Sequence, residues 1–551
     1  MLVSVAATRF RDDPGHALSK LRRVLPVGGS VPMTDGAAAA VQQACFEDDP
    51  FRATEYLAEI PDTDPQYLRL SALVARCRGD LLGAQKLAAA ALGASRGIEA
   101  VRARGLLREI IAERRSMDPA WQPTAPQAPP FTPVPGRVLH LVTFALPQQQ
   151  TGYTVRTQEI AVAQRAAGFD PHVVTRLGYP MLRGHWDAAD TDIVDGIAYH
   201  HLSVRRPFHA TATALIEQQI EATAELVQRL RPQLLHAATD HVNGRVALAL
   251  RERFGLPVVY EVRGFLEDSW LSRHDMAGAA DTERYLAARH LESLIVRRAD
   301  AVTTLGTHMR AEIIARGAEP DQVFIAPNGV DPRFLEDPPD ATGLREDLGI
   351  DPGERVIGTI TTLLLHEGVD TLLRAARRVL DTGVPLRVLV VGDGPRKAYL
   401  LQLADELGLG DRVIFPGRVP FADVAQWYAA LDVFCVPRVD ARVTRLVTPL
   451  KPVEAMAMGV PVLGSDLPAL HELIGDGRGW FARAQDPDDW ADQIIEVLAS
   501  PQESGRRAAV ARTWVQHFRR WPSIARTYQE VYGILGTVPK QNPTVGDGRV
   551  G

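Results

Sequence analysis

Cysteine is scarce in this chain, whose 551 residues include only Cys45, Cys77 and Cys435. The three stand far apart with no C-x-x-C spacing, so the sequence predicts neither a disulfide framework nor a zinc site, and it is typical of a reducing cytosol. Lysine is also rare, at five of the 61 basic residues. With 67 acidic residues the net charge is −6, which gives no indication of broad nucleic-acid binding.

Long apolar runs are missing as well. No uninterrupted run of about 18 apolar residues occurs, and the start, MLVSVAATRFRDDPG, lacks the basic and apolar segments of a secretory signal. We therefore expect a cytoplasmic protein that does not span a membrane, and peripheral contact with the inner face of the membrane stays open. The composition, 46% apolar and 23% charged, is that of a globular protein, and the length predicts about three domains.

Proline marks one domain boundary. Residues 119–135, PAWQPTAPQAPPFTPVP, have seven prolines in seventeen positions and predict an extended linker. Residues 1–118 predict a small helical domain, because apolar residues recur every three or four positions and Gly79 fits a helix–helix turn. This part resembles a tetratricopeptide-like helical pair with at most two copies. This helical domain is expected to pack on its own chain rather than to bind a protein partner. The residues after 118 are expected to fold without the helical domain.

After the linker, short β-branched runs alternate with helical stretches, which indicates parallel sheets covered by helices on both faces. Two sets of such runs predict two tandem Rossmann-like α/β domains, 136–330 and 331–517, joined near PNGVDPRF. A ligand cleft is expected between them, at the carboxyl ends of the strands. The tail, 536–551, is expected to be disordered. The runs are 137–146, 171–177, 234–238, 257–264, 301–306 and 322–327, then 355–360, 387–392, 412–417, 433–437 and 461–465.

Two stretches contain candidate binding residues. Gly152 follows Thr151 at the start of a helix, where free N–H groups suit an anion, although a single glycine at such a turn more often reflects only the turn geometry. The stretch lacks G-x-G-x-x-G, so no dinucleotide cofactor is predicted. In LVTPLKPVEAMAMG, Glu454 falls in the first turn of a helix, where a carboxylate is stabilised by the dipole or can accept vicinal ribose hydroxyls. Lys451, three residues earlier, is placed to meet a phosphate.

From about Arg137 to Leu535 the chain resembles a retaining glycosyltransferase of family 4, with the GT-B fold of two facing Rossmann-like domains. The similarity rests on pieces that occur in family order, among them LPQQQTGYTVRTQEIAVAQRAAG, VFIAPNGVDPRF, LVVGDGP and VTPLKPVEAMAMGVPVLGSD. It implies a nucleotide-sugar donor on the second domain and an acceptor on the first. Residues 518–535 are similar to the segment with which this family crosses back onto the first domain.

The resemblance also implies roles for individual residues. Glu454 would hold the ribose, and Leu450, Lys451 and Gly152 would surround the diphosphate. Arg418 and Val419 would line the base pocket, and His236 would lie near the reacting sugar, unless it is a hydrogen-bonded core histidine. Arg156 and Arg263 are candidate cleft cations that can equally be structural.

The chain departs from the family pattern at two places. The usual phosphate-binding Arg and Lys are replaced by Thr362 and Glu367, and the first of two family glutamates is replaced by Leu446. We expect Arg442, Arg445 or Lys451 to supply the positive charge instead. These departures leave the geometry and the identity of the donor open. They do not change the expected class of reaction.

The resemblance therefore implies a metal-independent, retaining, hexosyltransferase-type enzyme that uses a nucleotide-sugar, a UDP-sugar first, in polysaccharide, glycolipid or other glycoconjugate biosynthesis. No bound cofactor and no metal site are expected, since the adjacent His200 and His201 point to opposite faces of a strand. A degenerate GT-B scaffold that binds a nucleotide or a glycan without transfer is the alternative, and a sugar-nucleotide epimerase of the same architecture is a third.

Overall fold

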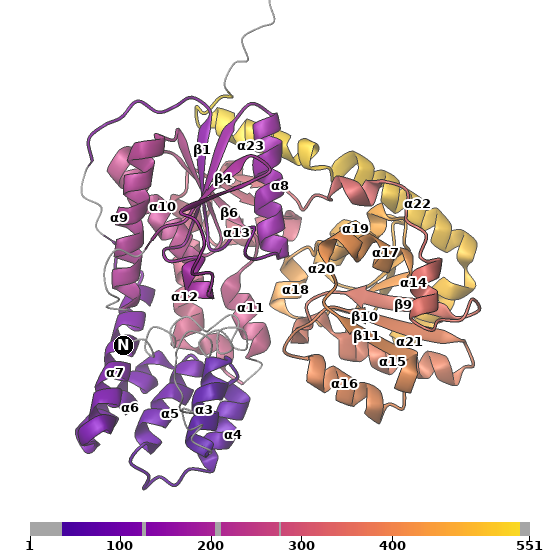
Figure 1. The fold of residues 1–551 in the computed structure, drawn as a ribbon, viewed down its shortest axis with the longest axis horizontal. Coiled ribbons are helices and arrows are strands. Elements are labelled where there is room, and N and C mark those ends of the chain that lie inside the picture. Colours follow the sequence, from indigo (N-terminus) through magenta and orange to yellow (C-terminus); the bar gives the residue numbers. More distant parts are fainter. Residues whose placement is uncertain (1–35, 124–127, 204–210, 275–276, 540–551) are drawn as a thin grey trace, which may run out of the picture.

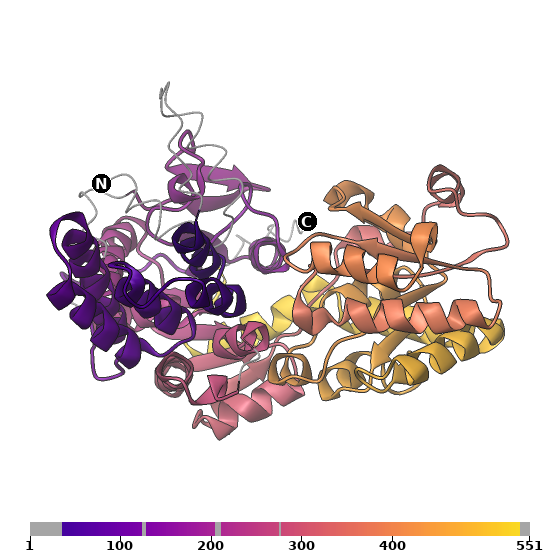
Figure 2. The ribbon, with the colours of Figure 1, turned by 90° about the horizontal axis from the view of Figure 1, so that it is seen from below.

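The computed structural model describes residues 36–123, 128–203, 211–274 and 277–539. A helical region and two α/β lobes are visible in Figure 1, with the helical region against the first lobe and the second lobe beside it. Figure 2 shows the same three parts from below. The predicted fold class, two parallel-sheet α/β domains preceded by an all-helical region, is confirmed. Within the described residues, none of the helices is long and apolar enough to cross a membrane.

The described part of the N-terminal region, residues 36–118, has five helices, and each packs against the next one along the chain. Gly79 turns the chain between two of them with a φ of +84°, and a Cβ there would lie 2.9 Å from the Trp270 ring of the first lobe. The region therefore packs on its own chain, at a contact too close for a larger residue. Its helices are α3 (Ala37–Phe46), α4 (Pro50–Ala58), α5 (Tyr67–Cys77), α6 (Leu81–Ala94) and α7 (Gly97–Met117).

The first lobe has an eight-stranded sheet in the order β3-β4-β2-β1-β5-β6-β7-β8, parallel except for β3. Alternate residues of β1 pack into two different hydrophobic cores. Leu139 and Leu141 belong to one core, and Val138 belongs to the other. Both faces of the sheet are therefore covered, as apolar runs without polar alternation predict. The strands are β1 (Arg137–Val142), β2 (Asp170–Thr175), β3 (Thr191–Val194), β4 (Ile197–His200), β5 (Leu234–Ala238), β6 (Val258–Val262), β7 (Ala301–Thr304) and β8 (Val323–Ile325). The helices are α8 (Gly152–Ala166), α9 (Ala212–Leu230), α10 (His241–Phe254), α11 (Leu266–Arg273), α12 (Glu283–Arg298) and α13 (Thr307–Ala315).

The second lobe has a six-stranded parallel sheet in the order β11-β10-β9-β12-β13-β14. Val388 and Val390 face one core, and Leu389 and Val391 face the other. The strand order reverses beside β9, the position at which sheets of this kind bind ligands. The strands are β9 (Arg355–Ile360), β10 (Leu386–Val391), β11 (Val413–Gly417), β12 (Val433–Val436), β13 (Val462–Ser465) and β14 (Trp480–Ala482). The helices are α14 (Thr342–Asp347), α15 (Val369–Asp381), α16 (Lys397–Glu406), α17 (Val424–Ala429), α18 (Arg442–Leu446), α19 (Lys451–Ala457), α20 (Pro468–Ile474) and α21 (Pro487–Ala499).

Two segments connect the lobes side by side. The backbone N–H of Val330, on the outgoing segment, donates to the carbonyl of Arg519 at 2.8 Å, on the returning one. Helix α22 (Pro501–Phe518) runs along the second lobe, and α23 (Trp521–Ile534) crosses back onto the first, as Figure 1 shows in yellow. Tyr528 and Tyr532 of α23 are fully buried there.

Each predicted strand run contains a strand, whereas β3 and β14 were not anticipated. The linker has no helix or strand over residues 119–123 and 128–135, and residues 124–127 lie outside the described part. Of the tail expected to be disordered, 540–551 also lie outside it. Residues 536–539 pack on the first lobe, where Gln233 donates to the carbonyl of Gly536 at 3.0 Å.

Candidate active site

A cavity of about 1010 Å³ lies between the two lobes. The second lobe lines it with the segments that follow β9, β10, β11 and β12 and with the start of α19, and the first lobe with residues 148–152 and parts of 179–185. Parallel strands end at the same edge of a sheet, so both sheets present their carboxyl ends here, where α/β folds bind ligands.

The N-terminus of α8 borders this cavity. Thr151 caps the helix, because its hydroxyl accepts from the N–H of Thr154 at 3.3 Å while the Thr154 hydroxyl accepts from the N–H of Thr151 at 2.9 Å. Gly152 is the first helical residue, and a Cβ built on it would meet no atom within 4 Å. The cap is thus fixed by side chains, while Gly152 leaves open space beside a helix end that favours anions.

Glu454 lies in the first turn of α19 and is 3% exposed. Its Oε2 accepts from the Tyr428 hydroxyl at 2.7 Å and from Lys451 Nζ at 2.9 Å. Among the described residues, no hydrogen-bond partner is recorded for its Oε1. The carboxylate is therefore held in one orientation through one oxygen, with the other able to accept from a ligand.

An ion pair between the segments that follow β9 and β12 borders the cavity. Arg438 Nη2 donates to Glu367 Oε1 at 2.8 Å, and Arg438 Nη1 donates to the carbonyl of Val447 at 3.1 Å. Burial opposes the charge of Glu367, but Arg438 outweighs it and lowers the pKa of Glu367 to about 2. Arg438 was missed in the sequence, although its place directly after the β12 run is a signal that could have identified it.

Eight of the ten predicted donor residues line the cavity: Gly152, Thr362, Glu367, Arg418, Val419, Leu450, Lys451 and Glu454. Arg442 and Arg445 do not, which corrects the expectation that they supply charge to this site. Arg442 pairs across the lobes with Asp268 at 3.1 Å and Glu312 at 2.9 Å, and Arg445 pairs with Asp440. Carboxylates outside the cavity neutralise both guanidinium groups.

The predicted first-lobe side chains lie instead in a buried network around Glu261, which sequence reasoning missed. Glu261 is fully buried and accepts from Arg156 at 2.7 Å and from Arg263 at 2.6 Å. Burial opposes its charge, and the two guanidinium groups lower its pKa well below the ordinary value. These side chains therefore hold the sheet together at its carboxyl edge, and they do not line the cavity.

His236 belongs to the same network and is fully buried. Its Nδ1 lies 2.6 Å from the Tyr532 hydroxyl and its Nε2 lies 3.4 Å from Glu261 Oε2. This is the arrangement of a core histidine, the alternative reading of that residue. Tyr528 also donates to Glu261 at 2.8 Å, so the network fastens α23 to the first sheet.

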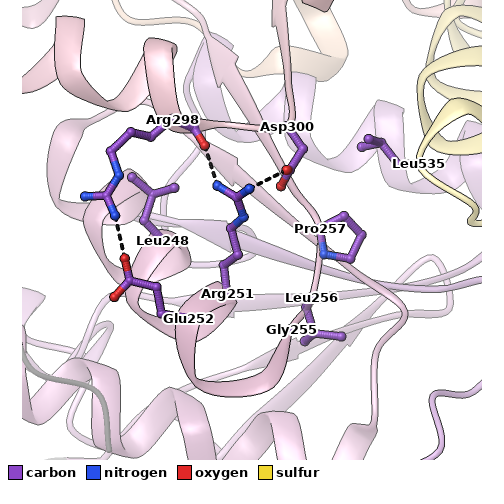
Figure 3. Close-up of a pocket in the computed structure, with 9 residues that line it drawn as sticks. All are labelled: Leu248, Arg251, Glu252, Gly255, Leu256, Pro257, Arg298, Asp300 and Leu535. Atoms are coloured by element: carbon purple, nitrogen blue, oxygen red, sulfur yellow. Dashed lines mark hydrogen bonds and ion pairs between the residues drawn. The ribbon is translucent and has the colours of Figure 1, made fainter. Parts of the chain in front are cut away.

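A smaller hollow of about 430 Å³ lies at the opposite, amino-terminal end of the first sheet, shown in Figure 3. Arg251 donates to the carbonyl of Arg298 at 2.6 Å and pairs with Asp300 at 2.7 Å, and Arg298 pairs with Glu252. The charged side chains that line this hollow therefore pair with one another. The hollow also lies away from the carboxyl ends of the strands, where ligands bind.

Two family models match the chain, "Glycosyl transferase 4-like domain" over residues 151–329 and "Glycosyl transferases group 1" over residues 354–500. D-inositol 3-phosphate glycosyltransferase from Nocardia farcinica is 28% identical over 418 residues, which are 72% of this chain and 88% of that protein. The enzyme of the same name from Rhodococcus erythropolis is 28% identical and covered to 90%.

Solved structures show the same fold. Sucrose-phosphate synthase from Thermosynechococcus elongatus superposes with a TM-score of 0.60 at 21% identity, over 73% of this chain and 99% of that one. HepE from Anabaena in complex with UDP-glucose superposes with a TM-score of 0.58 at 18% identity, over 73% and 100%. The chain therefore belongs to glycosyltransferase family 4, with two GT-B lobes and an additional N-terminal helical region.

Proposed function

We propose that this glycosyltransferase moves a hexose from a UDP-sugar to the hydroxyl of an acceptor, with retention of anomeric configuration and without a metal ion. The observation that carries the proposal is the cavity between the carboxyl ends of two sheets, which is lined by Glu454, Lys451 and the N-terminus of α8. The acceptor belongs to polysaccharide, glycolipid or other glycoconjugate synthesis.

The nucleoside binds to the second lobe. Glu454 Oε1 accepts from the ribose hydroxyls, because Tyr428 and Lys451 hold the other oxygen of that carboxylate. Arg418 and Val419, after β11, line the wall that faces the base. A UDP-sugar is favoured because the structural neighbour HepE was solved with UDP-glucose.

The diphosphate lies between the helix ends of the two lobes. Lys451 offers a cation from one side, and the α8 N-terminus offers N–H groups and the positive end of its dipole from the other. Negative charge grows on the diphosphate as its bond to the sugar breaks, so these groups stabilise the transition state more than the ground state. The departing phosphate accepts the proton of the acceptor hydroxyl, which attacks from the same face of the sugar.

A nucleotide-binding panel tests the donor site. We expect UDP, but not GDP, ADP, CDP or TDP, to raise the melting temperature equally with and without chelator, since ligand at 100 times its Kd adds about 2.7 kcal/mol of stability. Glu454→Ala should weaken UDP binding by about 1–3 kcal/mol through loss of charge-assisted hydrogen bonds. Glu496→Ala, an exposed glutamate on α21, is the matched control. Equal UDP affinity in a folded Glu454→Ala variant would remove this residue from the donor site.

Acceptor-dependent release of UDP separates transfer from the scaffold alternative. The wild-type protein is incubated with UDP-glucose and a panel of acceptors that includes D-inositol 3-phosphate, the substrate in the name of its relatives. Release only with an acceptor supports transfer, and the NMR coupling of the product's anomeric proton then reports retention or inversion. Nucleotide binding with no release for any acceptor supports a scaffold, and interconversion of free nucleotide-sugars supports an epimerase.

A further inference from the structure

Three side chains from distant parts of the chain meet where the helical region packs on the first lobe. One ligand atom each of Asp48, Cys77 and His274 lies within 4.8 Å of the other two. Cys77 is 6% exposed and His274 is fully buried. The Cys45 thiol is hydrogen-bonded to the Cys77 thiol, so a second thiol adjoins this group of three side chains.

The orientation of His274 is that of a metal ligand. Its Nδ1 lies 2.8 Å from the carbonyl of Trp270, which can only accept, so Nδ1 carries a proton and donates it. Its Nε2 is buried and has no hydrogen-bond partner among the described residues, and it lies 3.4 Å from Asp48 Oδ1. Metal-binding histidines almost always donate their second ring N–H in this way, which directs the other nitrogen at the metal.

The surrounding backbone also favours a cation. Cys45 is in the last turn of α3 and Asp48 follows that helix, Cys77 ends α5, and His274 caps the C-terminus of α11. Three helix C-termini, the negative ends of their dipoles, therefore meet at one place. The Asp48 side chain is 18% exposed, which leaves a route from solvent.

We propose that Cys45, Asp48, Cys77 and His274 form a structural zinc site. Two thiolates, one imidazole and one carboxylate are ligands that Zn²⁺ takes in closed, tetrahedral sites. Zinc–ligand bonds of about 2.0–2.3 Å require the atoms to draw closer than their present spacing. The site would fasten α3 and α5 to α11.

Helix α11 also touches the second lobe, since Asp268 pairs with Arg442 and Ser272 Oγ lies 3.2 Å from His366 Nδ1. The zinc ion would therefore stabilise the helix on which part of the contact between the lobes rests. This role is independent of the proposed donor chemistry and goes beyond it.

Metal analysis of the untagged full-length protein tests the site. After exposure to Zn²⁺ and gel filtration, we expect one zinc ion per chain in wild type and in the controls Cys435→Ser and His517→Gln. Cys77→Ser and His274→Gln should each retain at least about tenfold less zinc, because even changes to residues that only orient a ligand cost about tenfold in metal affinity. Chelator should lower the melting temperature of wild type and leave those two variants unchanged.

Cobalt substitution keeps the proposal testable if a variant fails to fold. Wild type loaded with Co²⁺ should show a thiolate-to-cobalt charge-transfer band together with the intense visible bands of tetrahedral Co²⁺. Failure of wild type to take up either metal would overturn the proposal, as would equal zinc in the ligand variants and controls. A Cys45–Cys77 disulfide in freshly purified protein, seen as a loss of two hydrogens by intact mass, would also overturn it.

Discussion

At the scale of single residues, Gly152 is a position where a substitution is expected to affect ligand binding without affecting the fold. Its Cβ position is open and its φ is not in the left-handed region, so a side chain there causes no clash within the protein. Its only evident advantage is the space that it leaves at the α8 N-terminus for an anion.

We expect Gly152→Val to weaken UDP-sugar binding by about tenfold, or about 1.4 kcal/mol, because the isopropyl group occupies space meant for the diphosphate. The melting temperature without ligand should stay close to that of wild type. Gly505→Val, another helical glycine with open surroundings, is the control, and titration calorimetry gives the affinities. Wild-type affinity in Gly152→Val would place the diphosphate elsewhere.

The ion pair of Glu367 and Arg438 is expected to contribute to the free energy of unfolding of the second lobe. Removing one partner leaves an uncompensated buried charge, so Arg438→Met should destabilise the second lobe by about 3–5 kcal/mol. The double variant Arg438→Met with Glu367→Gln should regain part of this loss, which thermal unfolding of all three proteins measures. Equal melting temperatures for wild type and Arg438→Met would contradict a stabilising role for this ion pair.

The same pair predicts a pH dependence. The folded pKa of Glu367, about 2, is below its ordinary value of 4.5. Its contribution is therefore fully present above about pH 4.5 and is lost as the pH falls toward 2. The double variant should lose less stability than wild type over that interval.

At the scale of elements, a carboxylate of the second lobe caps a helix of the first. The N–H groups of Thr307 and His308, which start α13, donate to Glu472 at 2.8 and 2.9 Å. Burial opposes the charge of Glu472, and these hydrogen bonds outweigh it and lower its pKa. The contact therefore holds above the ordinary carboxyl pKa and is lost as the pH falls through the lowered value.

Glu472→Gln should loosen this contact, because an amide offers only one accepting oxygen to two donors. A helix cap is worth about 0.5–2 kcal/mol, so we expect exchange of the Thr307 and His308 amide hydrogens to accelerate by about tenfold. Hydrogen exchange read by mass spectrometry of the α13 peptide measures it, with Glu496→Gln as the control. Unchanged exchange would show that the lobes are held by other contacts.

Strand β3 shows what an element-level reading can overlook. Asp195 and Gly196 both have positive φ, and they join β3 to β4 in a tight antiparallel hairpin. The Asp-Gly pair between alternating residues is a strong hairpin signal in the sequence. A strand was expected at His200, but its hairpin partner β3 was not, because β3 is a short edge strand without a fully buried residue.

At the scale of the whole molecule, the helical region is part of the first lobe's packing. Arg245 of α10 is 2% exposed and donates to the carbonyls of Ser116 and Trp121 at 2.6 and 2.8 Å. Burial lowers its pKa to about 10. Arg114 of α7 pairs with Glu283 of α12 at 2.8 Å.

Removal of residues 1–118 is therefore expected to destabilise the rest, contrary to the independent folding that the linker suggested. The truncated chain leaves Arg245 without one acceptor and exposes the Trp270 ring, which is 4% exposed in the full chain. We expect a lower melting temperature and a tendency to aggregate, measured by differential scanning fluorimetry and light scattering against the full chain. An equal melting temperature would restore the independent-domain interpretation.

The sequence by itself determined the architecture, because apolar runs of strand length between amphipathic helices specify parallel sheets wherever they occur. It also predicted the segments around the cavity, since strand ends follow directly from strand positions. Only the tertiary structure decided which charges face that cavity, because ion pairs such as Arg442 with Asp268 and Arg438 with Glu367 join residues far apart in the chain. The meeting of Cys77 with His274 likewise depends on packing between two regions, which no local spacing encodes.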